Sequence, residues 1–240
     1  MGRRLSQVSS LTFTRQGGVG RITLERVAKK NALGRAELDE LKRLCAALHD
    51  DDQVDVVVAQ AQGDFFCAGV DLTLIREVGA SRDGLVSLVA DNAAIVASLE
   101  RLPQLCIVVL NGPALGLGAH LALAADYLLA AEGAYLQFPE SRLGFPDLTH
   151  LELLQQRLGR SAALDLLLRG RRLDAAEARQ AGLIHSVHAS EALAGAVEAL
   201  VEELLAIPPV VRRVLKERCV AALPPSSVLA QAQAFSKLPS

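Results

Sequence analysis

The stretch NGPALGLGAHLALAADYLLAA, residues 111–131, decides the predicted fold. It follows the apolar run LCIVVL (105–110), and it joins a glycine-rich turn to a helical segment and then to a second apolar run, YLLAA (127–131). A second small-residue turn, FFCAGVDL (65–72), closes another apolar run, VDVVVAQA (54–61). Strands that run through such turns into helices are typical of α/β proteins. The two turns therefore predict an α/β fold with largely parallel strands.

The remaining segments extend this pattern in both directions. SLTFTRQ and GRITLE flank Gly17-Gly18 within residues 10–25, which predicts a β-hairpin. Apolar residues at helical spacing in 36–51 predict a helix, and residues 83–102 predict another. After Gly144 the segments are mostly helical in pattern and are separated by Gly or Pro.

The helical tail suggests a division of the chain. We predict a core over residues 1–187 and a C-terminal helical region over 188–240. Amphipathic helices must bury their apolar faces, either against the core of the same chain or against another subunit. The sequence leaves both arrangements open.

Composition excludes some classes of function. Hydrophobic residues make up 51% of the 240 residues, which is enough for a substantial core, while aromatic residues contribute only 3%. The formal net charge is −2, and basic residues gather only in short clusters such as Arg169 to Arg172. A nucleic-acid partner is therefore not expected.

The cysteines and the N-terminal segment bear on location and metals. Cys45, Cys67, Cys106 and Cys219 lack the spacing of a metal site, so no metal is expected. The start MGRRLSQVSS lacks the apolar core of a signal peptide, and charged residues interrupt the longest apolar stretches. We therefore expect a cytoplasmic protein that does not insert into a membrane.

The two turns offer main-chain groups for chemistry. Small residues allow backbone amides to approach a ligand closely. The amides near Leu117 also begin a predicted helix, where free N–H groups favour negative charge. Two amides that converge on one oxygen would form an oxyanion hole, in which each donor contributes about 3–4 kcal/mol in other enzymes. Most glycine-rich turns only close a chain reversal, so spacing alone does not establish this function.

The chain resembles the crotonase, or enoyl-CoA hydratase/isomerase, superfamily over about residues 8–220. Five segments carry the resemblance in order: KKNAL (29–33), FFCAGVDL (65–72), NGPALGLGAHLALAADYLLAA (111–131), FPESRLGFP (138–146) and LDAAEARQAGLIHSV (173–187). The resemblance implies a spiral of repeated ββα units with a C-terminal helical region that builds a homotrimer or a dimer of trimers. It also implies a coenzyme A thioester as substrate, with no separate cofactor.

The resemblance assigns main-chain roles to two residues. By motif position, the N–H groups of Val70 and Leu117 form the oxyanion hole, where an enolate would be held. Leu117 departs from the glycine that is usual in the family, but a side chain does not remove the amide. The positions that resemble substrate contacts are Ala28, Ala68, Asp71 and Leu72. Asp71 is expected to fix the first turn rather than to carry a proton.

Hydratases of this family usually carry two glutamates, and this chain departs from that pattern. At the first position it has His120, and at the second, in a PE motif, it has Glu140. A carboxyl group between apolar segments is expected to have a raised pKa suited to proton transfer. Histidine can act as an acid or base, yet a structural role on an apolar helix stays open for His120.

Asp147 is the third candidate acid. With a one-residue gap it falls near the position where dienoyl-CoA isomerases and chlorobenzoyl-CoA dehalogenases carry an aspartate. The alternative is a helix N-cap before LTHLELL, a position that Asp favours.

These residues predict an enzyme of the enoyl-CoA hydratase/isomerase family, most simply a double-bond isomerase with Glu140 as the proton shuttle. A single carboxylate can remove a proton and return it elsewhere, whereas adding water usually needs a second group. The alternatives are a hydratase or dienoyl-CoA isomerase that uses His120 or Asp147, a decarboxylase or thioester hydrolase, or a catalytically weak acyl-CoA-binding subunit.

Overall fold

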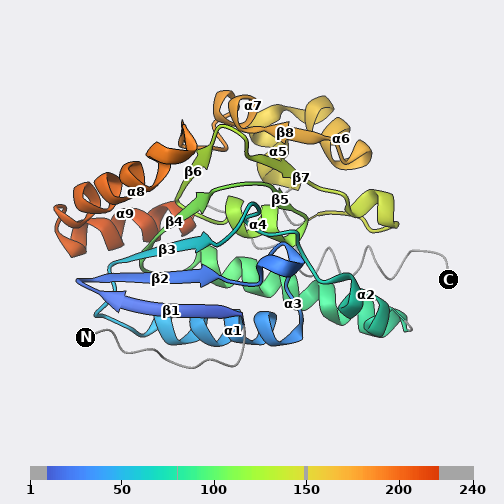
Figure 1. Cartoon of the computed structure of the whole chain (residues 1–240), viewed down its shortest axis with the longest axis horizontal. Helices are drawn as coiled ribbons and strands as arrows, with labels where there is room; N and C mark the ends of the chain where they lie inside the picture. Colours follow the sequence, from blue (N-terminus) through green and yellow to red (C-terminus); the bar gives the residue numbers. More distant parts are fainter. Residues whose placement is uncertain (1–9, 80, 149–150, 222–240) are drawn as a thin grey trace.

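A six-stranded sheet forms the centre of the computed structural model, which describes residues 10–79, 81–148 and 151–221 (Figure 1). The strand order is β1-β2-β3-β4-β6-β9. Its strands are β1 (Leu11–Gln16), β2 (Val19–Leu24), β3 (Val56–Ala61), β4 (Leu105–Leu110), β6 (Tyr127–Ala131) and β9 (Ser186–His188). Within this sheet β1 and β2 pair antiparallel, and the pairs from β2 to β9 are parallel. The α/β prediction with largely parallel strands is confirmed.

The β1–β2 hairpin is also confirmed. Its turn is Gly17-Gly18, with φ angles of 56° and 80°. These values lie in the left-handed region, which glycine adopts without a steric penalty. The register pairs Gln16 with Val19 next to the turn, so the antiparallel strands close through two residues.

Helices cover both faces of the sheet. Over the described residues the helices are α1 (Arg35–His49), α2 (Leu72–Val78), α3 (Arg82–Glu100), α4 (Leu117–Leu123), α5 (Leu151–Leu158), α6 (Arg160–Arg169), α7 (Ala175–Gln180), α8 (Ser190–Leu205) and α9 (Pro209–Ala221), with short 3-10 helices η1 (Val27–Lys29) and η2 (Glu140–Leu143). The predicted helices 36–51 and 83–102 correspond to α1 and α3. The mostly helical character after Gly144 is confirmed by α5 to α9.

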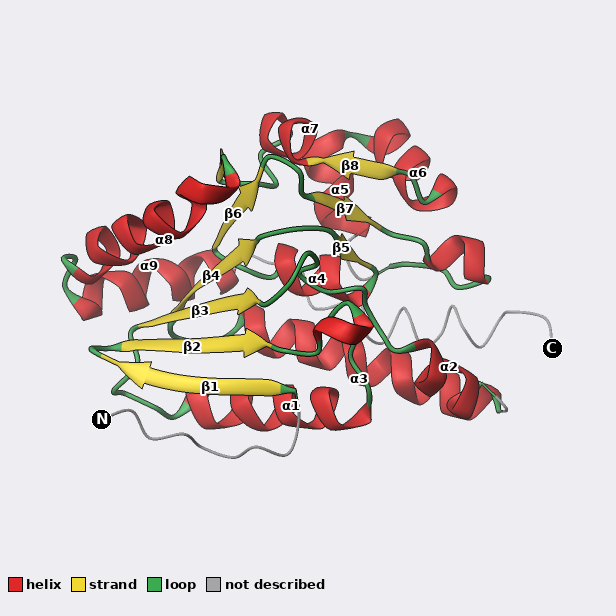
Figure 2. Ribbon diagram, viewed as in Figure 1, coloured by secondary structure: helices red, strands yellow, loops and turns green. Residues whose placement is uncertain are grey.

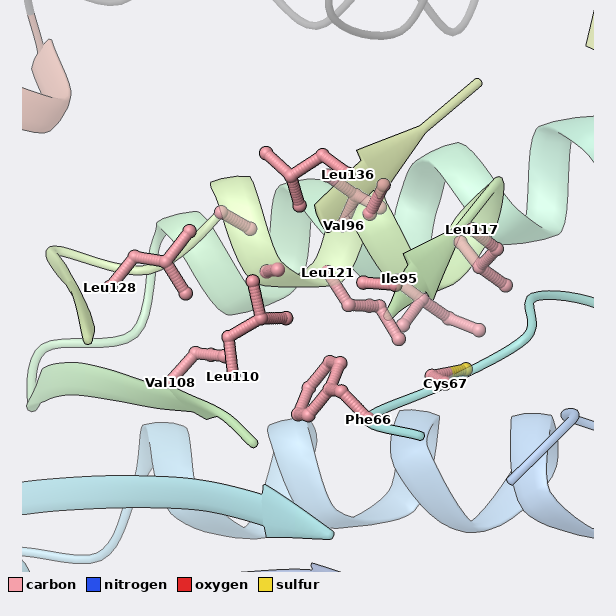
Figure 3. Packing of buried hydrophobic residues seen from close by; sticks show 14 of the residues in the cluster. Phe66, Cys67, Ile95, Val96, Val108, Leu110, Leu117, Leu121, Leu128 and Leu136 are labelled. Carbon is pink, nitrogen blue, oxygen red and sulfur yellow. The ribbon is translucent and has the colours of Figure 1, made fainter. Parts of the chain in front are cut away.

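The side chains of β3 and β4 alternate between two cores. Val57 and Val108 belong to the larger core, which includes residues of α1, α3 and α4. Val56 and Ile107 point to the other face and pack with the apolar residues of α8. Because successive strand residues face opposite sides, strands buried on both faces are apolar throughout. Figure 3 shows the larger core, where Phe66 lies near Leu110 and Leu121.

A second, smaller sheet has the order β5-β7-β8, with β5 (Ala114–Leu115), β7 (Tyr135–Gln137) and β8 (Arg172–Asp174) (Figure 2). Strand β5 lies within the second turn and forms a bridge from Ala114 to Cys67 of the first turn. The Leu115 amide donates to the Cys67 carbonyl at 2.9 Å. The main chain thus joins the two turns beyond the carboxyl ends of β3 and β4.

The sequence did not predict these strands of two or three residues, or β9, because so short a run shows no periodicity. Part of the C-terminal region, residues 222–240, lies outside the described residues, and the division at residue 188 stays a prediction. Of the helices that the structure describes, none combines the length and apolar character required to cross a membrane.

Candidate active site

A cavity of about 570 Å³ opens between the two turns, α2, α3 and the segment around η2. Its interior includes buried residues such as Leu88, Leu117 and His120, while Leu72 and Leu143 at its edge are exposed. A cavity of this size, mostly apolar with a few polar groups, is typical of a small-molecule site.

The first turn depends on Gly69. Its φ angle is 88°, and a Cβ atom at this position would lie 2.8 Å from the Leu115 carbonyl oxygen. Only glycine fits without displacing the backbone of the second turn. The neighbouring Asp71 amide donates to the Leu33 carbonyl, whereas the Val70 amide, on the cavity lining, has no acceptor among the described residues.

The second turn places the Leu117 amide in a similar position. Leu117 is the first residue of α4, so its N–H has no partner within the helix. Gly116 before it has φ 51°, and Gly118 after it packs so closely on Cys67 that a Cβ atom would overlap the Cys67 backbone. The Leu117 amide nitrogen lies 3.5 Å from the Cβ position built on Gly69. The structure thus brings the two predicted oxyanion residues to adjoining parts of one cavity.

Asp71 ends the first turn, and its carboxylate is held by hydrogen bonds on both sides of it. Its carboxylate caps α2 by accepting from the Thr73 amide at 2.8 Å and from Arg26 Nη1 at 2.7 Å. The hydrogen bond from the Thr73 backbone and the Arg26 guanidinium hold the pKa of Asp71 below its ordinary value, although burial acts in the opposite direction. Arg26 also donates to the Ala32 carbonyl, so its charge is used within the protein.

Glu140 lies at the cavity lining as the first residue of η2. Its Oε2 atom is buried and has no hydrogen-bond partner among the described residues. A Cβ atom on Gly116 would lie 2.8 Å from Oε1, so the glycine makes room for this carboxyl group. Burial raises the pKa of Glu140 to about 7, His120 acts to lower it, and Asp147 acts to raise it. A carboxyl group with this pKa can both accept and return a proton near neutrality.

His120 and Asp147 form a buried pair beside Glu140. His120 Nε2 lies 2.9 Å from Asp147 Oδ2, and the side chains are only 7% and 1% exposed. The His120 ring stacks on Phe138, with ring centroids 5.6 Å apart. Burial alone would lower the pKa of His120, but Asp147 and, more weakly, Glu140 outweigh it and raise this pKa to about 9.

The three candidate acid–base residues therefore come together. One ring nitrogen of His120 and one carboxyl oxygen from each of Glu140 and Asp147 lie within 4.8 Å of one another. Such spacing would also be compatible with a metal ion. The His120–Asp147 bond, however, already satisfies a ring nitrogen and a carboxylate oxygen with each other, so proton transfer is the simpler use of the cluster.

The predicted substrate contacts are only partly brought together. Ala68, Asp71 and Leu72 line the cavity, whereas Ala28 does not, although its neighbour Lys29 does. Sequence reasoning missed two further features of the site, the Phe138 ring under His120 and the space that Gly116 leaves for Glu140. Both residues lie within the quoted motifs, but no spacing rule connects them to the acids.

Comparison with known proteins identifies the family. Residues 14–238 match the model of the enoyl-CoA hydratase/isomerase family. A carnitinyl-CoA dehydratase from Citrobacter koseri is 33% identical over 210 residues, which cover 87% of this chain and 79% of the relative. A Delta(3,5)-Delta(2,4)-dienoyl-CoA isomerase from Pyricularia oryzae is 34% identical over 196 residues, or 76% and 69% of the two chains.

Solved structures agree in fold. A Thermobifida fusca YX protein in complex with acetoacetyl-CoA superposes with a TM-score of 0.81 at 31% identity, covering 95% of this chain and 93% of that one. The fold, the two joined turns and these matches together define the class. The chain belongs to the enoyl-CoA hydratase/isomerase family and is an enzyme of the crotonase superfamily.

Proposed function

We propose that this enzyme isomerises the double bond of an enoyl-CoA thioester, with Glu140 as the proton shuttle. The observation that carries the proposal is the difference between the two acid positions. Glu140 has a buried oxygen without a partner, whereas His120 at the other position is already paired with Asp147 at 2.9 Å. One available carboxyl group suits a proton shuttle better than the addition of water.

The names of relatives support an acyl-CoA thioester as the substrate. One relative is named a carnitinyl-CoA dehydratase, another a dienoyl-CoA isomerase, and a similar structure contains acetoacetyl-CoA. The lining residues Ala68 and Leu72 are proposed to contact the coenzyme arm, and α2 and α3 to enclose the acyl group.

The proposed reaction divides into two proton transfers. Glu140 takes a proton from C2 of a 3-enoyl thioester, and the electron pair delocalises to give a dienolate whose oxygen carries negative charge. The N–H groups of Val70 and Leu117 stabilise this oxygen more than they stabilise the neutral carbonyl, which lowers the barrier. Glu140 then returns the proton to C4, and the double bond moves into conjugation.

Solvent-exchange measurements test the reaction type. We expect the enzyme to interconvert 3-enoyl-CoA and 2-enoyl-CoA and to exchange deuterium at the α or γ carbon in D₂O. A panel of acyl-CoA thioesters of different chain length and branching would define the acyl group. Hydration of crotonyl-CoA without isomerisation or exchange would contradict the proposal. Calorimetry that detects acyl-CoA binding without any turnover would favour a binding subunit instead.

A dienoyl-CoA isomerase or hydratase is the second candidate. The observation that favours it is the position of Asp147 and His120. A carboxyl oxygen of Asp147 and a ring nitrogen of His120 each lie within 4.8 Å of a carboxyl oxygen of Glu140. Two acids at opposite ends of a diene could transfer protons at separate carbons. Conversion of 3,5-dienoyl-CoA to 2,4-dienoyl-CoA faster than 3-enoyl-CoA isomerisation would favour this candidate.

We also propose a trimer-based assembly in the cytoplasm. Apolar side chains on and just before α9 are exposed in the single chain, which supports burial against another subunit. They are Ile207, Val210, Val211, Val214 and Leu215. Light scattering that gives a monomer at micromolar concentration would contradict the assembly.

The proposed cytoplasmic location is supported by the cysteines. The structure shows Cys45, Cys67, Cys106 and Cys219 as free thiols, which suits a reducing compartment.

A further inference from the structure

The contact between His120 and Asp147 joins two elements that are distant in sequence. His120 belongs to α4, one helical turn beyond the Leu117 amide, and Asp147 lies 27 residues later in the segment before α5. Both side chains are almost fully buried, and Phe138 packs on the imidazole ring. Burying a carboxylate and an imidazole is costly unless they satisfy each other, so a pair at 2.9 Å indicates a specific interaction.

The charge of this pair decides what His120 can do. A neutral imidazole has one nitrogen lone pair and can accept a proton, whereas both nitrogens of an imidazolium are donors. Addition of water to an enoyl thioester requires a base that takes a proton from the water as the carbon–oxygen bond forms. A His120 ring held as an imidazolium has no lone pair for this step.

We propose that Asp147 is a positioning residue that holds His120 in its donor-only form, so that Glu140 is the proton acceptor available to the substrate and isomerisation is favoured over hydration. The proposal rests on the proposed function of Glu140 as the shuttle. It assigns Asp147 a role in the choice of reaction without requiring it to touch the substrate.

The charged groups around His120 are consistent with this role. Burial acts to lower the pKa of His120, whereas two carboxyl groups, those of Asp147 and Glu140, act to raise it. Against the penalty of burial, they raise the pKa of His120 to about 9, so the ring stays protonated at neutral pH. Phe138, on the face of the ring, offers no competing hydrogen bond. Without Asp147, burial would favour the neutral ring.

Imidazole NMR of the full-length protein tests the charge state directly. In ¹⁵N-labelled wild-type protein we expect the His120 ring to be protonated at pH 7.5 and to titrate near pH 9. In Asp147→Asn we expect the titration to fall below the ordinary histidine value of about 6.5. Asp147→Glu, which keeps a carboxylate, should keep the ring protonated at pH 7.5. Asp126→Asn removes a carboxylate that binds Lys216 and does not line the cavity, so it should leave His120 unchanged.

The ratio of hydration to isomerisation provides the second measurement. At pH 8, Asp147→Asn should raise the ratio of hydration to isomerisation by about tenfold or more, since a positioned base contributes about 10²-fold or more. Asp147→Glu should retain the wild-type ratio. A neutral His120 ring in the wild type, or an unchanged ratio in an Asp147→Asn protein whose ring has become neutral, would overturn the proposal.

The two proposals fail in different ways. If the wild type catalyses no isomerisation, the proposed function is wrong, yet the NMR titration still reports whether Asp147 controls the charge of His120. If the wild type isomerises but its His120 ring is neutral at pH 7.5, only the role of Asp147 is wrong. Should Asp147→Asn fail to fold, the wild-type and Asp147→Glu titrations still decide the outcome.

Discussion

The cavity has two functional walls that are built in different ways. The amide wall consists of main-chain groups, the N–H of Val70 and the N–H of Leu117, held by two turns that hydrogen-bond to each other. The acid wall consists of the side chains of His120 on α4 and Glu140 on η2, which line the cavity. Asp147, in the segment before α5, contacts His120 but is not itself a lining residue, and it is counted with this wall because it acts on His120.

We propose that this difference separates stabilisation of the enolate from the choice of reaction. Main-chain donors depend on backbone geometry, so many side chains can be exchanged around them without loss of the N–H groups. The acid wall can change its chemistry by a single substitution, because each proton transfer depends on one side chain. We therefore expect the amide wall to stabilise the enolate and the acid wall to decide where protons move.

The largest expected loss of activity follows from a substitution in the acid wall. Glu140→Gln removes the proposed proton shuttle but keeps a side chain of similar size. We expect deuterium exchange and isomerisation to fall by about 10²–10⁴-fold, while calorimetry still shows acyl-CoA binding. Glu132→Gln, at an exposed glutamate away from the cavity lining, is the matched control and should leave both activities unchanged. Undiminished exchange in Glu140→Gln would remove Glu140 from the mechanism.

The next largest loss of activity is expected from removing a donor of the amide wall. Proline is tolerated at the first residue of a helix, so Leu117→Pro should keep α4 while removing one proposed donor. We expect kcat to fall by about 10²–10³-fold, the loss measured for single oxyanion donors. Leu117→Ala keeps the N–H and should lose much less activity. Equal losses in the two variants would show that the Leu117 side chain, rather than its amide, matters.

The pH dependence should distinguish the walls, because only the acid wall titrates. Burial raises the pKa of Glu140 to about 7, and the base must be ionised to take the first proton. We therefore expect kcat/KM for isomerisation to fall about tenfold per pH unit below pH 7 and to level above it. In Glu140→Gln the residual kcat/KM should no longer fall below pH 7. A rate that stays constant down to pH 5 would indicate that Glu140 has the ordinary pKa of an exposed carboxyl group.

The smallest expected effect is on the support of the amide wall. Asp71→Ala removes the cap of α2 and the ion pair with Arg26. We expect a loss of about 1–2 kcal/mol in the free energy of unfolding, measured by urea denaturation, with a modest decrease in activity. Asp71→Asn keeps a capping oxygen and should lose less. A loss of activity as large as that of Leu117→Pro would show that Asp71 takes part in the reaction itself.

The amide wall was largely predictable from the sequence. Gly69 lies in the first of the two turns and Gly118 in the first helical turn of α4, each following an apolar strand, and close backbone contact requires glycine at both positions. The parallel strands β3 and β4 are adjacent, so their carboxyl ends bring the turns together. The family motifs also gave the positions of Val70 and Leu117.

The acid wall was only partly predictable. Sequence analysis named Glu140, His120 and Asp147 separately, but no local pattern shows that His120 and Asp147 bind each other across 27 residues. Their contact arises from how α4 packs against the segment after η2. For the same reason the stacking of Phe138, and the absence of Ala28 from the cavity lining, emerged only from the structure.

The most direct test of the amide wall is the carbonyl vibration of a bound acyl-CoA labelled with ¹³C at the thioester carbonyl. If the N–H groups of Val70 and Leu117 both donate to this oxygen, the infrared band should shift to lower wavenumber on binding. About half of the shift should disappear in Leu117→Pro. A band that stays at its position in free acyl-CoA, in a complex that calorimetry shows to be saturated, would contradict the central claim that these amides hold the enolate oxygen.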